Sequence, residues 1–270
     1  MAQGQKTNTA KSGFSVPPFL VMIVALIVSE LIFHFVFGNL SHFKDSLRKE
    51  PNPGDYMGII YKGGVIVPFL MTMFIVVITF SIERHLTIGK AAGTGNLENF
   101  LRSVKAKLAG NDINGALAEC DKQKGAVANV VQAGLLKYAE MEKNTELEGE
   151  KKVLAIQQEV EESTALELPA LEQNLPILAT IASVGTLIAL LGTVIGMIKA
   201  FAALATSGSP DPAALASGIS EALINTALGI FTSAIAIIMY NLFTSKIDKL
   251  TYGIDEIGYS LSQSFASRKH

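Results

Sequence analysis

The sequence has 270 residues, of which 49% are hydrophobic and 17% are charged, and its mean hydropathy is +0.38. An average globular chain carries about 25% charged residues, so this composition indicates an integral membrane protein. The formal net charge of −2 leaves no basic surface for nucleic acid, and the single cysteine, Cys120, excludes an internal disulfide or a cysteine-based zinc cage.

Four apolar segments are long enough to cross a bilayer, which takes about 18 or more apolar residues. The last two contain no Asp, Glu, Lys or Arg: 174–198 and 222–245. We therefore predict an all-α membrane protein with three transmembrane helices of one kind, an additional N-terminal one, and long helices that extend into the cytoplasm.

The first apolar segment, about 16–37, follows Lys6 and Lys11, as the core of a signal peptide would. Its apolar run is too long for a signal peptide, and no small-residue cleavage site follows it. We interpret it as a retained transmembrane helix. Glu30 and His34 lie one turn apart on one face of this helix, and we expect them to pair with each other.

A polar block, 83–173, separates the second and third apolar segments and carries 11 basic and 15 acidic residues. Lys124-Gly125 is typical of a turn, and the pattern from 128 to 168 predicts helix with little interruption. We expect Glu148 and Lys152 to form an i,i+4 ion pair. The block is interpreted as a solvated helical domain without an active site.

The C-terminal tail is amphipathic, with apolar residues in 3-4-3-4 spacing. This stripe consists of Ile247, Leu250, Ile254, Ile257 and Leu261. The spacing predicts a helix that continues the fourth apolar segment and packs against the polar block.

Basic residues indicate the topology. The polar block and the tail together carry 15 Lys and Arg, whereas the loop 200–221 carries none, so the block and the tail are predicted to be cytoplasmic. The loop contains a Ser, Gly and Pro-rich turn at 207–212. The predicted segments of the first half are a cytoplasmic N-terminus with the additional transmembrane helix (1–37), a periplasmic loop (38–64), a transmembrane helix (65–82) and the cytoplasmic block (83–173). Those of the second half are a pore-lining helix (174–198), a periplasmic turn (199–221), a second pore-lining helix (222–245) and a cytoplasmic amphipathic helix (246–270).

Small and hydroxylated residues follow one face of each of the last two apolar segments. They are Thr186, Gly192, Thr193 and Gly196 in the third segment, and Thr226, Gly229 and Ser233 in the fourth. Glycines let helix backbones approach closely, and hydroxyls either join helices or bond their own backbone. Helix packing and pore lining are both compatible with this pattern, which by itself favours packing.

Glu221 stands at the edge of the fourth apolar segment. An ionisable residue at this position is either a functional group or a hydrated interfacial carboxylate. We expect Lys199, at the end of the third segment, to extend its ammonium outward, and we predict no role for it.

Several segments resemble the MotA/TolQ/ExbB proton-channel family, and ExbB and TolQ most closely. They are 191–197 (LGTVIGM), 221–229 (EALINTALG), 240–243 (YNLF), Gly63-Gly64 and Glu83-Arg84. The first two, correctly spaced across a hairpin, are the strong signal. The likeness begins near Gly63, so the additional N-terminal helix departs from the family's three-span pattern.

The resemblance implies a homopentamer in the bacterial inner membrane, surrounded by lipid. Its pore holds the transmembrane helices of an ExbD- or TolR-like subunit, and proton flow drives motion that is passed to a TonB- or TolA-like protein. It also places the family's pore threonines at Thr193 and Thr226 and its carboxylate at Glu221, and so favours pore lining. Thr186 and Ser233 are predicted to extend this proton pathway, with Gly192, Gly196 and Gly229 in helix packing.

A chemical argument agrees with this resemblance. Transfer of a proton across a bilayer requires a group that changes charge, or a chain of hydroxyls and water. The last two apolar segments have no ionisable side chain at mid-depth, so a partner helix with an aspartate in the pore would complete the site. We predict no cofactor and no metal.

The leading prediction is an ExbB-like subunit that energises TonB-dependent outer-membrane transport. A TolQ-like envelope motor and a MotA-like or gliding stator are alternatives within the family. A passive helical membrane scaffold is the alternative from another class. A secondary transporter is disfavoured because the sequence has no internal repeat. Enzymatic activity is not predicted, because no nucleophile and base can be assembled.

Overall fold

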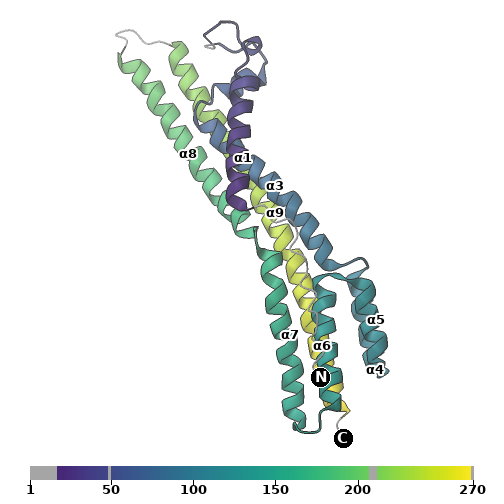
Figure 1. Cartoon of the computed structure of the whole chain (residues 1–270). Coiled ribbons are helices and arrows are strands. Elements are labelled where there is room, and N and C mark those ends of the chain that lie inside the picture. Colours follow the sequence, from purple (N-terminus) through teal and green to yellow (C-terminus); the bar gives the residue numbers. More distant parts are fainter. Residues whose placement is uncertain (1–16, 48–49, 207–211, 269–270) are drawn as a thin grey trace. The chain divides into compact units, whose positions relative to one another are not determined.

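The structure is a computed structural model that describes residues 17–47, 50–206 and 212–268 (Figure 1). Lys6, Lys11 and residues 207–211 of the expected turn lie outside the described residues. In the described ranges the chain is helical throughout most of its length and forms no strand, only one isolated bridge between Phe43 and Pro51. The predicted all-α fold is confirmed.

Among the residues that the structure describes, four helical runs are long and apolar enough to cross a membrane, as predicted. They are Pro18–Phe37, Ile66–Ala109, Leu175–Ala205 and Pro212–Ser267. The first therefore confirms the additional N-terminal helix. The helices that form these runs are α1 (Pro18–Leu31) with a π-helical end (Ile32–Phe37), α3 (Ile66–Ala92) followed by α4 (Leu97–Ala109), α8 (Leu175–Thr206) and α9 (Pro212–Ser267).

The chain divides into two compact units. One, here called the apolar unit, comprises Met1–Phe80 and Ala179–Ile237; the other, the polar unit, comprises Ser81–Leu178 and Ile238–His270. Helices α3, α8 and α9 each contribute residues to both units.

In the apolar unit, α1 begins with Pro18 in its first turn, where the missing N–H has no helical partner to lose. The expected Glu30–His34 pair forms, with 3.4 Å between Oε2 and Nε2. The π-helical turn, Ile32–Phe37, was not predicted and places Phe33 against Tyr61, with ring centroids 4.7 Å apart. Tyr61 ends the short helix α2 (Tyr56–Tyr61), which precedes α3.

Helices α8 and α9 are longer than the charge-free segments that predicted them. Residues 199–206 and 212–221, expected as a turn, are helical. Both stretches are rich in alanine, which has the highest helix propensity of all residues. The positions between the two stretches, 207–211, are Ser, Gly, Ser, Pro and Asp, and the second stretch opens with Pro212, which is tolerated in the first turn of a helix.

The polar unit contains α4 (Leu97–Ala109), α5 (Ile113–Gln123), α6 (Gly125–Lys143) and α7 (Gly149–Glu172). Helices α6 and α7 form a hairpin (Figure 1). The predicted turn at Lys124-Gly125 is present, with positive φ angles of 56° and 86°.

The predicted helix from 128 to 168 is present apart from one short interruption, where Asn144 accepts the N–H groups of Glu146 and Leu147 in the turn between α6 and α7. One expectation for this block was wrong, because Lys152 does not pair with Glu148. Its ammonium is buried and donates to the carbonyl of Asn144, and Lys151 pairs with Glu148 instead.

The C-terminal part of α9 packs in the polar unit, as predicted. All five residues of its apolar stripe are buried. Leu261 lies against Gly134 of α6, and Gly253 lies against Leu101 of α4. An ion pair between Lys105 and Glu256 adds a polar contact at the edge of this packing.

Arg84 caps the end of α7 within the polar unit. Its side chain is buried, and its guanidinium donates to the carbonyls of Ala170 and Leu171, each at 3.0 Å. The last four carbonyls of a helix have no partner within the helix, and α7 ends at Glu172. Arg84 therefore supplies hydrogen bonds that α7 lacks, while Glu83 neutralises its charge.

Candidate proton-path site

Helices α8 and α9 of the apolar unit approach closely through small residues. A Cβ atom added to Gly196 would lie 2.8 Å from the backbone nitrogen of Ala222 and from the carbonyl of Gly218. One added to Gly192 would lie 2.7 Å from the Cβ of Asn225, and one added to Gly229 would overlap Ala189. All three glycines that the sequence singled out therefore lie where the facing helix, through its backbone or a side chain, leaves no room for a Cβ atom.

The two candidate pore threonines meet at this seam. The hydroxyls of Thr193 and Thr226 are in hydrogen-bond contact, and both residues are half-buried. Each hydroxyl also lies close to the carbonyl one turn earlier on its own helix, Thr193 to Ala189 at 3.2 Å and Thr226 to Ala222 at 3.1 Å. These contacts hold the hydroxyls close to acceptors within the protein but leave both threonines partly exposed.

The other two hydroxyl residues of the predicted pathway have different surroundings. Thr186 is exposed. Ser233 is buried against Gly185, and its Oγ has no hydrogen-bond partner among the described residues. The hydroxyl stripe thus extends from the interior of the α8–α9 seam to its open edge.

Glu221 is 8% exposed and forms an ion pair that the sequence analysis missed. Lys199 of α8 donates to its Oε1 at 2.5 Å. The expectation that Lys199 ends the helix and points outward was wrong, because α8 continues to Thr206 and so keeps Lys199 beside α9. The signal in the sequence was the pair of opposite charges that flank the charge-free segments.

Asn225, one turn after Glu221, is the second residue that sequence reasoning passed over. Its side chain is fully buried, and its amide donates to the carbonyl of Gly63 at 3.0 Å. The carboxylate of Glu221 lies over Gly64, where a Cβ atom would be 2.6 Å from Oε1. Gly64 has a φ of +74°, which also favours glycine. Two polar side chains of α9 therefore rest on the turn that precedes α3.

Few groups at this site can carry charge. Lys199 and Glu221 are the only Asp, Glu, Lys, Arg or His residues in the described parts of α8 and α9 that belong to the apolar unit. They neutralise each other, and the remaining polar groups are hydroxyls and one amide. No group of His, Cys, Asp and Glu residues suited to a metal ion occurs in the described part of the chain. The arrangement can orient water and hydrogen-bond a carboxylate, but it lacks a proton carrier at mid-depth.

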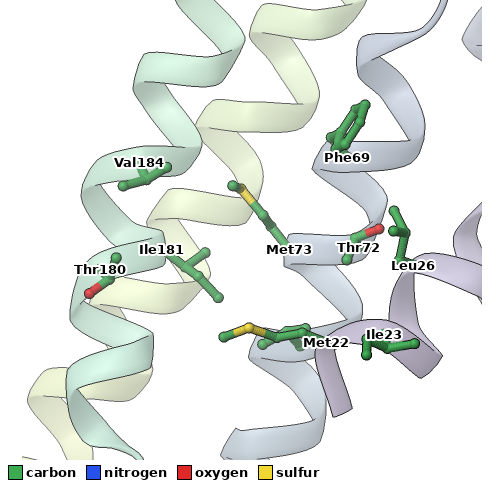
Figure 2. A pocket seen from close by; sticks show the side chains of 10 residues that line it. Met22, Ile23, Leu26, Phe69, Thr72, Met73, Thr180, Ile181 and Val184 are labelled. Carbon is green, nitrogen blue, oxygen red and sulfur yellow. The ribbon is translucent and has the colours of Figure 1, made fainter. Parts of the chain in front are cut away.

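A separate groove of 370 Å³ lies between α1, α3 and α8 in the apolar unit (Figure 2). Its lining is almost entirely apolar and includes Met22, Phe69, Met73 and Ile181. None of the predicted pathway residues lines it. Thr72, one of its hydroxyl residues, donates to the carbonyl of Pro68 at 2.7 Å. No ionisable side chain lines this groove.

Comparison with known proteins adds an independent observation. A model described as the MotA/TolQ/ExbB proton channel family matches residues 122–256, which is half of the chain. The matched range contains the complete α8–α9 seam, including Thr193, Lys199, Glu221 and Thr226. It does not contain α1 or α3.

Individual relatives are similar over a shorter range. The chain is 32% identical over 124 residues to the Tol-Pal system protein TolQ of Pseudomonas aeruginosa, which is 46% of this chain and 54% of the relative. It is 39% identical over 109 residues to TolQ of Haemophilus influenzae, covering 38% of this chain and 48% of that protein. It is 31% identical over 131 residues to the biopolymer transport protein ExbB of Pseudomonas putida, covering 48% and 39%. The chain thus spans about half the length, or less, of these curated relatives.

Proposed function

We propose that this chain, which belongs to the MotA/TolQ/ExbB proton channel family, lines a proton path in a motor driven by the proton-motive force in the bacterial inner membrane. The observation that carries the proposal is the contact between the hydroxyls of Thr193 and Thr226, in those parts of α8 and α9 that belong to the apolar unit and carry almost no charge. Thr186 and Ser233 extend the path. The role is transport, with no catalysed chemical reaction.

The missing proton carrier defines the partner. Hydroxyls bind and orient water, and a group that changes its charge would complete a proton path across the hydrocarbon. We propose that an ExbD- or TolR-like subunit supplies an aspartate on its transmembrane helix, within a pore formed by a homopentamer of this chain. Thr193 and Thr226 then hydrogen-bond this carboxylate, and Glu221 acts as a polar gate or coupling residue.

The proposed topology of the last two helices rests on the distribution of basic residues, from which we place the block 83–173 and the tail 246–270 in the cytoplasm and the segment 199–221 in the periplasm. The segment 38–64 carries four basic residues, and we place it in the periplasm because one membrane-spanning helix separates it from the cytoplasmic block. Motion of the partner is passed to a TonB-like protein that energises outer-membrane transport. The relatives include both TolQ and ExbB, so a TolQ-like envelope motor is the second candidate.

Proton flux through the assembled complex tests this proposal. The chain is co-purified with its ExbD-like partner, reconstituted in liposomes with a pH-sensitive dye inside, and subjected to a pH gradient. We expect Thr226→Val and Thr193→Val to lower the flux by at least about tenfold, because valine keeps the shape of threonine but removes the hydroxyl. Native mass spectrometry checks that each variant still assembles.

A matched control is Thr251→Val, which removes a hydroxyl from the same helix. Thr251 donates to the carbonyl of Ile247 at 3.1 Å and belongs to the polar unit. Its flux should equal that of the unmodified chain. Full flux in Thr226→Val would remove the pore assignment, and a complex that conducts no protons in any form would favour the passive scaffold.

A further inference from the structure

We propose that Lys199 is a positioning residue, which holds the Glu221 carboxylate against Gly64. Through this contact α8, α9 and the start of α3 are held together as one rigid unit. The inference rests on the proposed function for its flux measurement, but the ion pair itself is tested independently below. It assigns a role to a residue that the sequence pattern left without one.

The geometry singles out this pair. Glu221 has a side chain that is only 11% exposed, whereas the Lys199 side chain is 52% exposed. The ammonium therefore retains access to its surroundings while the carboxylate is enclosed by protein. A carboxylate removed from water is stable only when a cation or several hydrogen bonds compensate its charge. Lys199 provides that compensation at 2.5 Å.

Neighbouring backbone also fixes the position of the enclosed Glu221 carboxylate. Glu221 Oε1 lies 2.6 Å from the position that a Cβ atom of Gly64 would take, which is too close for any side chain at this position. Asn225, on the same face of α9, donates to the carbonyl of the adjacent Gly63. The two contacts hold α9 on the turn before α3, and Lys199 extends the connection to α8.

This arrangement explains why a lysine at the open end of the hairpin does not simply extend into the surroundings. A long ammonium side chain loses conformational entropy when it is held in one position, and an exposed ion pair contributes too little to compensate. Here one partner is enclosed, so the interaction is stronger than at a surface. The consequence is that displacement of α8 relative to α9 at this end requires the ion pair to separate.

A double-mutant cycle tests the pair without reference to proton transport. The unfolding temperature of the detergent-purified full chain is measured for Lys199→Met, Glu221→Gln and the double variant. We expect Lys199→Met to have the lowest unfolding temperature, because it leaves an enclosed carboxylate without its cation. The double variant should recover part of that loss. Effects that simply add would overturn the pair.

Proton flux per assembled complex tests the positioning role. Lys199→Met should lower the proton flux by about tenfold. Lys199→Arg preserves the charge, so its proton flux should be close to that of the unmodified chain. Lys249→Met, which changes an exposed lysine elsewhere on α9, is the matched control and should change neither quantity. Unchanged flux in Lys199→Met, despite a coupled unfolding temperature, would overturn the positioning role.

The two measurements also separate this inference from the proposed function. If the unmodified complex conducts no protons, the proposed function is contradicted, and so is the role of Lys199 in transport. The unfolding cycle still decides whether the ion pair exists. A conducting complex with additive unfolding effects contradicts only the inference about Lys199.

Discussion

The hydroxyl of Thr193 on α8 contacts the hydroxyl of Thr226 on α9, and each is also within hydrogen-bond distance of a carbonyl on its own helix. A threonine hydroxyl has one proton to donate and two lone pairs that accept. Two protons therefore have to serve three hydrogen bonds, so one bond is unmade in any arrangement of the protons. The pair keeps acceptor capacity for a third group, such as water or a carboxylic acid, which is what a proton path requires.

Close packing of α8 on α9 predicts that Gly196→Ala destabilises the protein. The new methyl group would lie 2.8 Å from the backbone of both Ala222 and Gly218, neither of which can rotate away. We expect a loss of about 1–3 kcal/mol in the free energy of unfolding, measured by denaturant or thermal unfolding in detergent. Gly89→Ala is the control, because no heavy atom lies within 4 Å of its added Cβ. Equal stability of the two variants would contradict the packing.

The cap that Arg84 places on α7 predicts a larger effect in the polar unit. Arg84→Met removes both hydrogen bonds to the carbonyls of Ala170 and Leu171 and leaves Glu83 without its cation. We expect the free energy of unfolding to fall by about 3 kcal/mol. Arg84→Lys should lie in between, because an ammonium cannot reproduce the fork of a guanidinium. Arg102→Met, an exposed arginine on α4, should be neutral; a similar loss there would contradict the assignment.

Cys120 is predicted to be chemically inert in the folded protein. Burial raises the pKa of its thiol to about 12, whereas an exposed cysteine has a pKa of about 8.5. Only the thiolate reacts, so alkylation by iodoacetamide at pH 8 should be about a thousandfold slower in the native chain than in denaturant. Mass spectrometry of the labelled chain provides the rate. Rapid labelling under native conditions would show that α5 opens readily.

Asp112 predicts a dependence of stability on acidic pH. Its carboxylate accepts the N–H of Gly115 at 2.8 Å as the N-cap of α5, and the hydrogen bond from Lys107 at 2.9 Å lowers the pKa of Asp112. A carboxyl whose pKa is lower in the folded state stabilises the fold above its ordinary pKa, and this contribution is lost as the pH falls through the folded-state value.

The variant Asp112→Asn keeps a side chain that can cap α5, but this side chain is neutral at every pH and therefore does not titrate. We therefore expect the difference in unfolding temperature between the original chain and this variant to shrink below about pH 4. Circular dichroism melts from neutral pH to pH 2.5 measure that difference. A difference that stays constant over this range would show that the Lys107–Asp112 pair does not contribute.

Local patterns predicted the helices well, whereas contacts between distant residues could not be predicted. The apolar stripe from Ile247 to Leu261 can be recognised in the sequence because its residues recur every three or four positions. Its burial in the polar unit was predicted from that spacing. The hydrogen bond between Asn225 and Gly63 joins residues 162 positions apart, and nothing in either segment specifies the other. The Lys199–Glu221 pair was missed because helix α8 continues past the charge that was taken as its end.

Competition between local interactions explains the other differences. Lys152 had an acidic residue at the correct spacing, but it bonds the carbonyl of Asn144, where the turn between α6 and α7 leaves an acceptor. The π-helical turn at Ile32–Phe37 has no marker in its composition, and it forms next to the aromatic contact between Phe33 and Tyr61. The Thr193–Thr226 contact was predicted only as two stripes of similar chemistry, without their relative register.

Accessibility of the hydroxyl stripe to water tests the central claim most directly. Thr186 and its neighbour Leu187 are both exposed on the isolated chain, the latter at 63%, but they point in different directions around α8. Each is changed to cysteine in a Cys120→Ser background, and the chain, reconstituted without the proposed partner, is treated with a charged, membrane-impermeant methanethiosulfonate. We predict that Thr186→Cys reacts and Leu187→Cys does not. Reaction at Leu187→Cys with protection of Thr186→Cys, or no reaction at either, would contradict a shared aqueous pore.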